Sequence, residues 1–334
     1  MQFDENLKKV VVLGTGGTIA GTAQSGFDNI GYTAAQLGIG ALLEDAAGLP
    51  DALSGDRLDS EQVAQIDSKD MCFEIWLALA QCVRRHLAQP DVRGVVITHG
   101  TDTLEETAYF LQAVLPAALI NAKPVVLTCA MRPASAQNPD GPQNLLDAVA
   151  VVRSPGAQGV VAVCAGAVHT ALDVQKNHTY QLDAFSSGDA GALAYVEEGQ
   201  LRMLRNWPLA IDDKASSAIE IIANTVPWPR VEVVMSYAGC SGAVVDAMRQ
   251  PLTNTWPVRG FVVAGTGNGT IHHDLEQALR RAAQCGIKVV RATRCANGRV
   301  LAAPGREFNH SNGLSPVKAR IALMLQLMLQ PEAG

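Results

Sequence analysis

The 334-residue chain has few aromatic residues, no excess of positive charge and no long apolar run. Aromatic residues make up 5% of it, and 26 basic against 32 acidic residues give a formal net charge of −6. A chain of this charge has no general attraction to nucleic acid or anionic membranes. No run of eighteen apolar residues is free of charge, which excludes a transmembrane helix. We therefore expect neither nucleic acid nor a membrane as a partner.

Cysteine is also sparse, and its pattern excludes a disulfide framework of the usual kind. The seven cysteines are an odd number, form no C-x-x-C pair and lie mostly in apolar stretches, where a free cysteine acts as a small apolar side chain. Residues 1–9 contain no apolar segment of the kind that a secretory signal needs. These features predict a cytoplasmic protein, or a periplasmic one if a signal has already been removed.

The first glycine-rich loop lacks both common nucleotide-binding patterns. Residues 10–13 are apolar and predict a short buried strand. Ile19 stands where the third glycine of G-x-G-x-x-G belongs, and no Lys-Ser/Thr pair follows. The loop instead presents the Thr18 hydroxyl among glycines, at the strand end where open α/β sheets bind small molecules. A tight turn without a ligand is the alternative.

Apolar strands alternate with helical segments along the chain, which predicts an α/β protein. Strands are expected at residues 10–13, 94–97, 124–129, 159–164, 231–237, 260–265 and 287–293. Helices are expected at residues 33–49, 72–89, 104–119 and 273–285, and from residues 144 and 316 onward. The length favours two domains. We expect a larger domain at 1–205 with a mostly parallel sheet and helices on both faces, a linker at 206–228, and a smaller flavodoxin-like α/β domain at 229–334.

The loop after the second predicted strand concentrates polar side chains. Thr103 and Glu106 have the spacing of a helix capping box, which leaves Thr101 and Asp102 unexplained. A threonine nucleophile needs a base and donors that hold an oxyanion. Lys176, isolated in the middle of the chain, would ease removal of the Thr101 proton if it lay nearby. A surface lysine is the alternative.

Other polar positions have both a structural and a functional interpretation. The Tyr32 hydroxyl either takes part in chemistry or the ring anchors a mobile loop. Ser68 or Asp70 is expected to cap the following helix, and Asn268, between two glycines, has the setting of a left-handed turn residue. The sequence shows one acid–histidine cluster, at residues 272–274. Adjacent histidines do not share a helix face, so no metal site is expected there.

Two long strings resemble the bacterial-type L-asparaginases and their asparaginase/glutaminase relatives. They are Thr-Gly-Gly-Thr-Ile-Ala-Gly at 15–21 and Thr-His-Gly-Thr-Asp-Thr-Leu-Glu-Glu-Thr-Ala at 98–108. Their order and separation agree with that family. Weaker agreement continues through residues 131–133, 140–142, 173–176, 267–269 and 318–320. The resemblance therefore covers nearly the whole chain.

This resemblance implies an enzyme that hydrolyses L-asparagine to L-aspartate and ammonia through a threonine-linked acyl-enzyme, without a cofactor or metal. It implies catalytic roles for Thr18, Tyr32, Thr101, Asp102 and Lys176. It implies substrate-binding roles for Gly17, Ser68, Lys69, Thr101, Asp102 and Asn268. Within the family, opinion differs over which threonine attacks first. Beyond the amino-acid substrate, the expected partner is another copy of the chain, in a dimer of dimers where a neighbour lends Asn268.

The chain departs from the family pattern at three places, one of which is a loop before Asp173 that is shorter than usual. Lys69 stands where many members have glutamine, and residues 295–308 contain no recognisable counterpart of the acid that a partner subunit supplies. Glu307 is the nearest candidate. With fewer groups to hold the substrate ammonium, we expect asparagine to be hydrolysed in preference to glutamine.

Three alternative functions share the same scaffold. One is a glutaminase-asparaginase. Another is the glutamine-hydrolysing subunit of an amidotransferase, expected to carry a further domain before the first strand. The third is a non-enzymatic amino-acid sensor, which the presence of Thr18, Thr101 and Lys176 disfavours.

Overall fold

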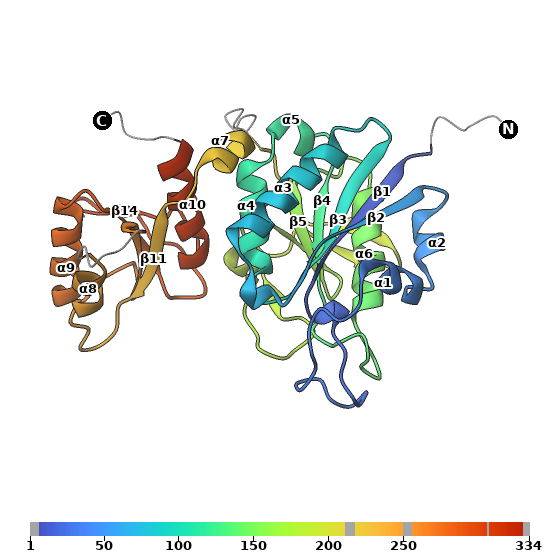
Figure 1. The fold of residues 1–334 in the computed structure, drawn as a ribbon, viewed down its shortest axis with the longest axis horizontal. Helices are drawn as coiled ribbons and strands as arrows, with labels where there is room; N and C mark the ends of the chain where they lie inside the picture. The colour runs from blue at the N-terminus through green and yellow to red at the C-terminus, as the bar shows by residue number, and fades with distance from the viewer. Residues whose placement is uncertain (1–6, 211–217, 250–255, 306, 330–334) are drawn as a thin grey trace. The chain divides into compact units, whose positions relative to one another are not determined.

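The computed structural model describes residues 7–210, 218–249, 256–305 and 307–329. Two compact units divide the chain, unit 1 at Met1–Ile219 and unit 2 at Glu220–Gly334. Each unit has its own sheet and helices (Figure 1), which confirms the predicted α/β fold. Residues 211–217 of the predicted linker lie outside the described residues, and the predicted domain limits stay a prediction. Among the described residues, no helix has the length and apolar character to cross a membrane.

Unit 1 is built on an eight-stranded sheet of order β10-β9-β6-β5-β4-β3-β1-β2. The strands β2, β1, β3, β4 and β5 run parallel, and β6, β9 and β10 extend the sheet in antiparallel pairing. The strands are β1 (Lys9–Gly16), β2 (Arg57–Ile66), β3 (Val92–Thr98), β4 (Val125–Thr128), β5 (Val160–Cys164), β6 (Ala167–Thr170), β9 (Ala194–Glu197) and β10 (Gln200–Met203). A separate ribbon pairs β7 (Gln175–Lys176) with β8 (Phe185–Ser186).

The helices of unit 1 cover the valine-rich strands. They are α1 (Ile39–Asp45), α2 (Leu49–Leu53), α3 (Phe73–Leu87), α4 (Leu104–Val114), α5 (Ala117–Ile120) and α6 (Gly141–Arg153), and α7 (Ala218–Asn224) follows. Val10 and Val12 of β1 pack into one apolar cluster with α1, α2 and α6. In the α3–α4 pair, Trp76 stacks on Phe110 at 5.0 Å and donates to the Thr107 hydroxyl at 2.8 Å.

Several helix limits differ from the sequence prediction, each for a local reason. The helix expected over residues 33–49 is confined to α1. The helix expected over 104–119 is interrupted between α4 and α5, where Pro116 has no backbone N–H to continue it. The α6 helix begins earlier than residue 144, at Gly141, with Pro142 in its first turn. Strand β2 was not expected, because its polar sequence belongs to a sheet edge.

Unit 2 has a four-stranded parallel sheet in the sequential order β11-β12-β13-β14. Its elements are β11 (Arg230–Met235), α8 (Ala243–Arg249), β12 (Val258–Gly265), α9 (His273–Gln284), β13 (Lys288–Thr293), β14 (Asn309–His310) and α10 (Pro316–Leu329). The three strands and two helices expected here are confirmed, whereas α8 and β14 were not expected. Gly286, with φ of +81°, follows α9 as the predicted helix terminator.

The buried Asp56 carboxylate connects separate parts of unit 1. Its oxygens accept hydrogen bonds from Arg93 of β3 at 3.0 Å, Arg153 of α6 at 3.1 Å and the Lys8 backbone N–H at 3.2 Å. Burial acts to raise the pKa of Asp56. The hydrogen bond and charge of Arg93, with the Arg153 and Lys8 hydrogen bonds, outweigh burial and hold that pKa below its usual value.

We predict that Asp56→Asn lowers the free energy of unfolding at pH 7 by about 1–3 kcal/mol, because two guanidinium groups lose a charged acceptor. Because the pKa of Asp56 is lower in the folded than in the unfolded protein, the ionised carboxylate stabilises the fold at pH values above the unfolded-state pKa. This stabilisation is lost as the pH falls towards the folded-state pKa. The difference between the wild type and Asp56→Asn should therefore shrink below about pH 4. Urea unfolding at both pH values measures it. Asp59→Asn is the control, because the Asp59 carboxylate is exposed and its pair with Lys9 at 3.4 Å should contribute little. Equal stability of wild type and Asp56→Asn at pH 7 would contradict this account.

Candidate functional site

Two polar loops meet where the neighbouring parallel strands β1 and β3 end. Gly17, with φ of +83°, has its backbone against Gly100, so that a Cβ on Gly17 would overlap the Gly100 backbone. The Thr15 hydroxyl donates to the Thr98 carbonyl at 2.9 Å and ties the two strand ends together. The loop at 15–21 therefore reaches the loop at 98–103 through backbone contact.

Thr18 opens the short 3-10 helix η1 (Thr18–Ala20) and is buried. Its hydroxyl oxygen lies 2.7 Å from the Tyr32 hydroxyl oxygen, within hydrogen-bond distance. The Tyr32 ring also packs against Gly21, and the adjacent Thr33 pairs with Thr22 through two backbone hydrogen bonds of 2.9 Å. Tyr32 thus both anchors its loop and presents its hydroxyl to Thr18.

Lys176 joins Thr101 and Asp102 from a distant part of the chain. Its Nζ donates to the Thr101 hydroxyl at 2.8 Å and to an Asp102 carboxylate oxygen at 2.7 Å. Thr101 is buried, the Lys176 side chain is 20% exposed, and Asp102 is half exposed. The surface-lysine interpretation is therefore wrong, and an ammonium, a hydroxyl and a carboxylate lie together.

Ser68 connects these loops to the segment after β2. It begins the 3-10 helix η2 (Ser68–Asp70), whose N-terminus is capped by the Asp67 carboxylate. The Ser68 hydroxyl accepts the Asp102 backbone N–H at 3.2 Å, and its carbonyl accepts the Thr103 hydroxyl at 2.8 Å. Ser68 is therefore not the cap of α3, which begins after Cys72. The predicted capping box at Thr103 is also wrong, because that hydroxyl bonds Ser68 and not the α4 backbone.

Two other predicted binding residues have different surroundings. The Lys69 ammonium is exposed and pairs with Asp67 at 2.7 Å and Asp70 at 3.1 Å, and the hydrogen bonds that it donates to these two acids raise its pKa. Asn268 belongs to unit 2, where its amide oxygen accepts the Leu301 N–H at 2.7 Å. In that loop Gly267 and Gly269 have positive φ, whereas Asn268 does not. The interpretation of Asn268 as a left-handed turn residue is therefore wrong.

Glu307, the acid nearest to the expected partner-subunit position, also lies in unit 2. Its carboxylate accepts a hydrogen bond from Arg280 of α9 at 2.6 Å. An acid already paired with a guanidinium has less free charge with which to attract a second cation.

Two side chains outside the predicted site residues support the loops. His99 is completely buried, and burial lowers its pKa to about 4, so that a neutral imidazole donates to the Gly100 carbonyl at 2.8 Å. Arg132 donates to the Tyr180 carbonyl at 2.9 Å and lies over its ring. Tyr180 lies between β7 and β8, so Arg132 holds the ribbon that carries Lys176. The string at 131–133 was the only sequence signal for Arg132.

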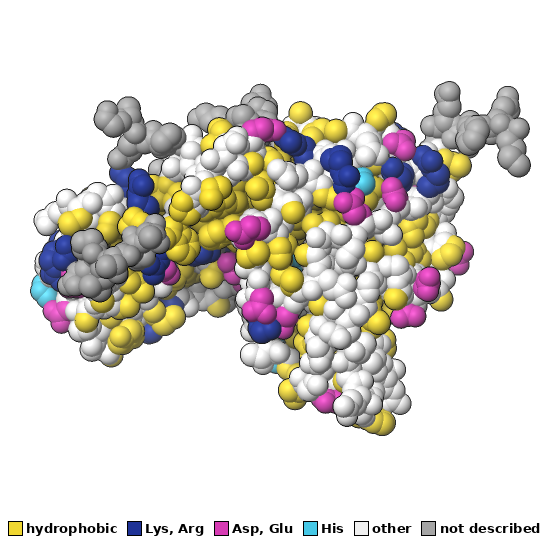
Figure 2. Space-filling view, in the orientation of Figure 1, with side chains coloured by type: hydrophobic (Ala, Val, Ile, Leu, Met, Phe, Trp, Pro, Cys, Tyr) yellow, Lys and Arg dark blue, Asp and Glu magenta, His cyan; other side chains and the backbone are white. Residues whose placement is uncertain are grey.

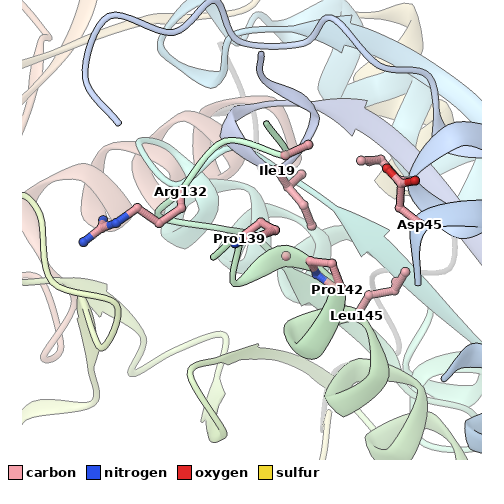
Figure 3. A pocket seen from close by; sticks show the side chains of 9 residues that line it. Ile19, Asp45, Arg132, Pro139, Pro142 and Leu145 are labelled. Carbon is pink, nitrogen blue, oxygen red and sulfur yellow. The ribbon is translucent and has the colours of Figure 1, made fainter. Parts of the chain in front are cut away.

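A cavity of about 320 Å³ lies beside this cluster. Ile19 of η1 lines it, together with Asp45 of α1, Pro139 and the first turn of α6 (Figure 3). The Arg132 guanidinium points away from the other labelled residues, consistent with its bond to Tyr180. No sequence-predicted site residue lines this cavity. The polar groups of the two loops, not this hollow, define the candidate site.

The expectation that residues 272–274 form the only acid–histidine cluster is wrong. The His272 ring accepts the Asp274 N–H at 3.2 Å and caps α9. Glu61 and His86, which are separated in sequence, come together in the fold. The site itself offers two buried threonines, an amine and a carboxylate, which suits acyl transfer by a hydroxyl nucleophile.

Comparison with known proteins extends these observations to the whole chain. Residues 9–209 match the family model described as Asparaginase, N-terminal, and residues 230–332 match the Glutaminase/Asparaginase C-terminal domain. The chain is 33% identical to L-asparaginase 2 of Bacillus subtilis (strain 168), over 97% of this chain and 83% of that protein. It is 35% identical to the glutaminase-asparaginase of Pseudomonas fluorescens biotype A, over 96% and 86%.

A solved structure gives the same result. It is the crystal structure of a probable cytoplasmic L-asparaginase from Campylobacter jejuni, with a TM-score of 0.85 and 36% sequence identity. The match covers 96% of this chain and 95% of that one.

Because the chain is closely packed around Gly100, the stability of the protein should depend on the side-chain volume at that position. A Cβ at Gly100 would lie 2.6 Å from Ser68 Cβ and 3.1 Å from Gly17 Cα, so Gly100→Ala must displace Ser68 and crowd Gly17. We expect a cost of about 1–3 kcal/mol in the free energy of unfolding. Gly40→Ala is the matched control, because a Cβ at Gly40 of α1 meets no atom within 4 Å and should stabilise the helix. Thermal unfolding compares the two variants. A Gly100→Ala midpoint at or above that of Gly40→Ala would refute the contact.

Proposed function

The chain belongs to the asparaginase family and hydrolyses L-asparagine to L-aspartate and ammonia, and we propose that Thr18 is its nucleophile. The observation that carries this proposal is that two threonine hydroxyls, each with its own hydrogen-bond partner, stand on loops in backbone contact. Thr18 has the Tyr32 hydroxyl at 2.7 Å, and Thr101 has the Lys176 amine at 2.8 Å.

In the first step, the Thr18 oxygen attacks the side-chain amide carbon of asparagine. Its proton passes to the Tyr32 oxygen while the Tyr32 hydroxyl proton passes to the leaving nitrogen, which departs as ammonia. Backbone N–H groups of the glycine-rich loop are the available donors for the oxygen that becomes negatively charged. The product of this step is an ester between the substrate acyl group and Thr18.

In the second step, water hydrolyses this ester and releases aspartate. We assign Thr101, Asp102 and Lys176 to proton transfer in this half of the reaction. Lys176 donates to the Thr101 oxygen and to the Asp102 carboxylate, and so holds both groups in fixed positions. The alternative, in which Thr101 attacks first, uses the same contacts in the opposite order.

Substrate binding is assigned to groups beside the two threonines. Gly17 lets the substrate approach the backbone, Ser68 binds the α-carboxylate, and Asp102 binds the α-ammonium. The burial of Ser68 and its hydrogen bond to the Asp102 N–H support a shared position for the two groups. Lys69 is assigned a weaker role at the edge of the site, since its ammonium already pairs with two acids.

We predict that Thr18→Ala lowers kcat for ammonia release from L-asparagine more than about a hundredfold, which corresponds to about 2.7 kcal/mol of barrier. The reason is that the variant lacks the oxygen that forms the acyl-enzyme. Thr22→Ala, in the same loop and paired with Thr33 through its backbone, should keep near wild-type turnover. Assays with L-asparagine and L-glutamine measure both variants and the substrate preference. Near-normal turnover by a folded Thr18→Ala would show that the nucleophile assignment is wrong.

We propose further that the enzyme is a homo-oligomer in which a neighbouring chain supplies Asn268 to the site. Two features of unit 2 support this. Val233, Met235 and Tyr237 leave apolar side chains exposed along and just after β11, an edge strand of the sheet. Asn268 is exposed on a loop that its own hydrogen bonds to Leu301 hold in shape. An exposed apolar strip on a sheet edge is a common subunit contact.

Mixing two inactive variants tests this assembly. Thr18→Ala and Asn268→Ala chains should each be impaired, and hybrids should regain part of the activity because some sites receive both intact residues. Labelled chains of each type confirm that subunits have exchanged. Absence of rescue after verified exchange would exclude a site shared between chains.

We also propose that the enzyme acts in the cytoplasm. The support is its likeness to the Campylobacter jejuni protein, whose title describes a probable cytoplasmic L-asparaginase.

A further inference from the structure

Outside the two threonine loops, one group of side chains has the composition of a metal site. Among the described residues, Glu61, Cys82 and His86 form a group whose ligand atoms all lie within 4.8 Å of one another. Cys82 and His86 are four residues apart on α3 and therefore share a helix face. Glu61 comes from β2 at the sheet edge. Cys82 and His86 are buried, whereas the Glu61 side chain is 40% exposed.

The guanidinium of Arg85 lies at the point where these three ligand atoms converge. Its Nη2 atom is 2.5 Å from Glu61 Oε2, 3.2 Å from Cys82 Sγ and 3.4 Å from His86 Nε2. One cationic atom thus contacts a carboxylate, a thiol and an imidazole at the same time. A divalent ion bound by the same atoms needs bonds of about 2.0–2.3 Å, so Cys82 and His86 must move inward when the ion replaces the guanidinium.

One pair of ligand atoms already has about the separation that a tetrahedral ion imposes, and the whole group lies within 4.8 Å. Glu61 Oε2 and His86 Nε2 are 3.0 Å apart, and ligands at about 2.0 Å from a tetrahedral centre are roughly 3.3 Å apart. The Arg85 side chain is 58% exposed, so it can move into solvent without disturbing the core. In Figure 2, basic, acidic and histidine side chains lie next to one another on the surface over α3 and β2.

We propose that Glu61, Cys82 and His86 bind one Zn²⁺ ion, with water as the fourth ligand, and that Arg85 competes for the same position. Thiolate, imidazole and carboxylate are the ligands that zinc takes in proteins, whereas Mg²⁺ and Ca²⁺ prefer oxygen ligands alone. On binding, the Cys82 thiol releases its proton to solvent as the zinc–sulfur bond forms, and the Arg85 side chain turns outward. The exposed side of Glu61 leaves access for the ion and the water.

Zinc at this position would connect β2 directly to α3. The η2 turn with Ser68 lies between Glu61 and Cys82 in sequence, so the ion closes a loop around it. We therefore expect zinc to raise the thermal midpoint of unfolding and to slow amide hydrogen exchange in residues 61–86. The inference is independent of the proposed nucleophile, because its measurements do not involve amide hydrolysis.

Cobalt titration of the purified full chain tests the site, since Co²⁺ replaces Zn²⁺ and reports its ligands by absorption. We expect one Co²⁺ per chain with a sulfur-to-cobalt charge-transfer band, and full displacement by Zn²⁺. Cys82→Ser should abolish the band, and Glu61→Gln should weaken Zn²⁺ binding about tenfold or more. Cys72→Ser is the matched control, because Cys72 is an exposed cysteine next to the same helix. It should leave the band unchanged.

The Arg85→Gln variant distinguishes a zinc site for which Arg85 competes from a simple ion pair between Arg85 and Glu61. Removing the competing guanidinium should tighten Zn²⁺ binding about tenfold, whereas loss of a merely structural ion pair would leave the metal affinity unchanged. The absence of a charge-transfer band in the wild type would overturn the proposal. So would a band that survives in folded Cys82→Ser or disappears in Cys72→Ser. Unchanged Zn²⁺ binding by both Glu61→Gln and Arg85→Gln would likewise overturn it.

Discussion

The close approach of two backbones at Gly17 and Gly100 is the constraint on which the candidate site depends. Strands β1 and β3 are adjacent and parallel, so their loops emerge at the same edge of the sheet. Only residues without a Cβ let the loops come into contact there, and Gly17 also needs a positive φ. The separation of Thr18 from Thr101 is therefore a property of the sheet and not of either loop alone.

Much of the fold could be predicted because buried parallel strands have a plain signature. Val10–Leu13 are apolar without alternation, and the loops after them are rich in glycine and hydroxyls. Strand β2 was missed because an edge strand with one solvated side carries Arg57, Asp59 and Gln62, which look like a loop in one dimension. Pro116 was visible in the sequence, but the apolar residues around it suggested a continuous helix.

Most residues of the candidate site could be predicted from the sequence, but the contacts between them could not. Thr18, Thr101 and Asp102 lie in diagnostic strings, whereas Lys176 was notable only for its isolation. Its bond to Thr101 spans 75 positions in the chain, and no local pattern encodes such a distance. The capping interpretation of Thr103 failed for a related reason, since its real partner, the Ser68 carbonyl, is also remote in sequence. The Glu61–Cys82–His86 group was missed because its members come from two elements.

The position of Lys176 on the β7–β8 ribbon has a consequence for how the enzyme is made. All five parallel strands of unit 1 precede residue 165, so a ribosome delivers them, with both threonines, before the lysine. Because chains fold from the N-terminal end during synthesis, the parallel core can form while the ribbon is still in the exit tunnel. Under the proposed mechanism, a nascent chain therefore completes the framework that holds both threonines before it gains the amine that turnover of the acyl-enzyme requires.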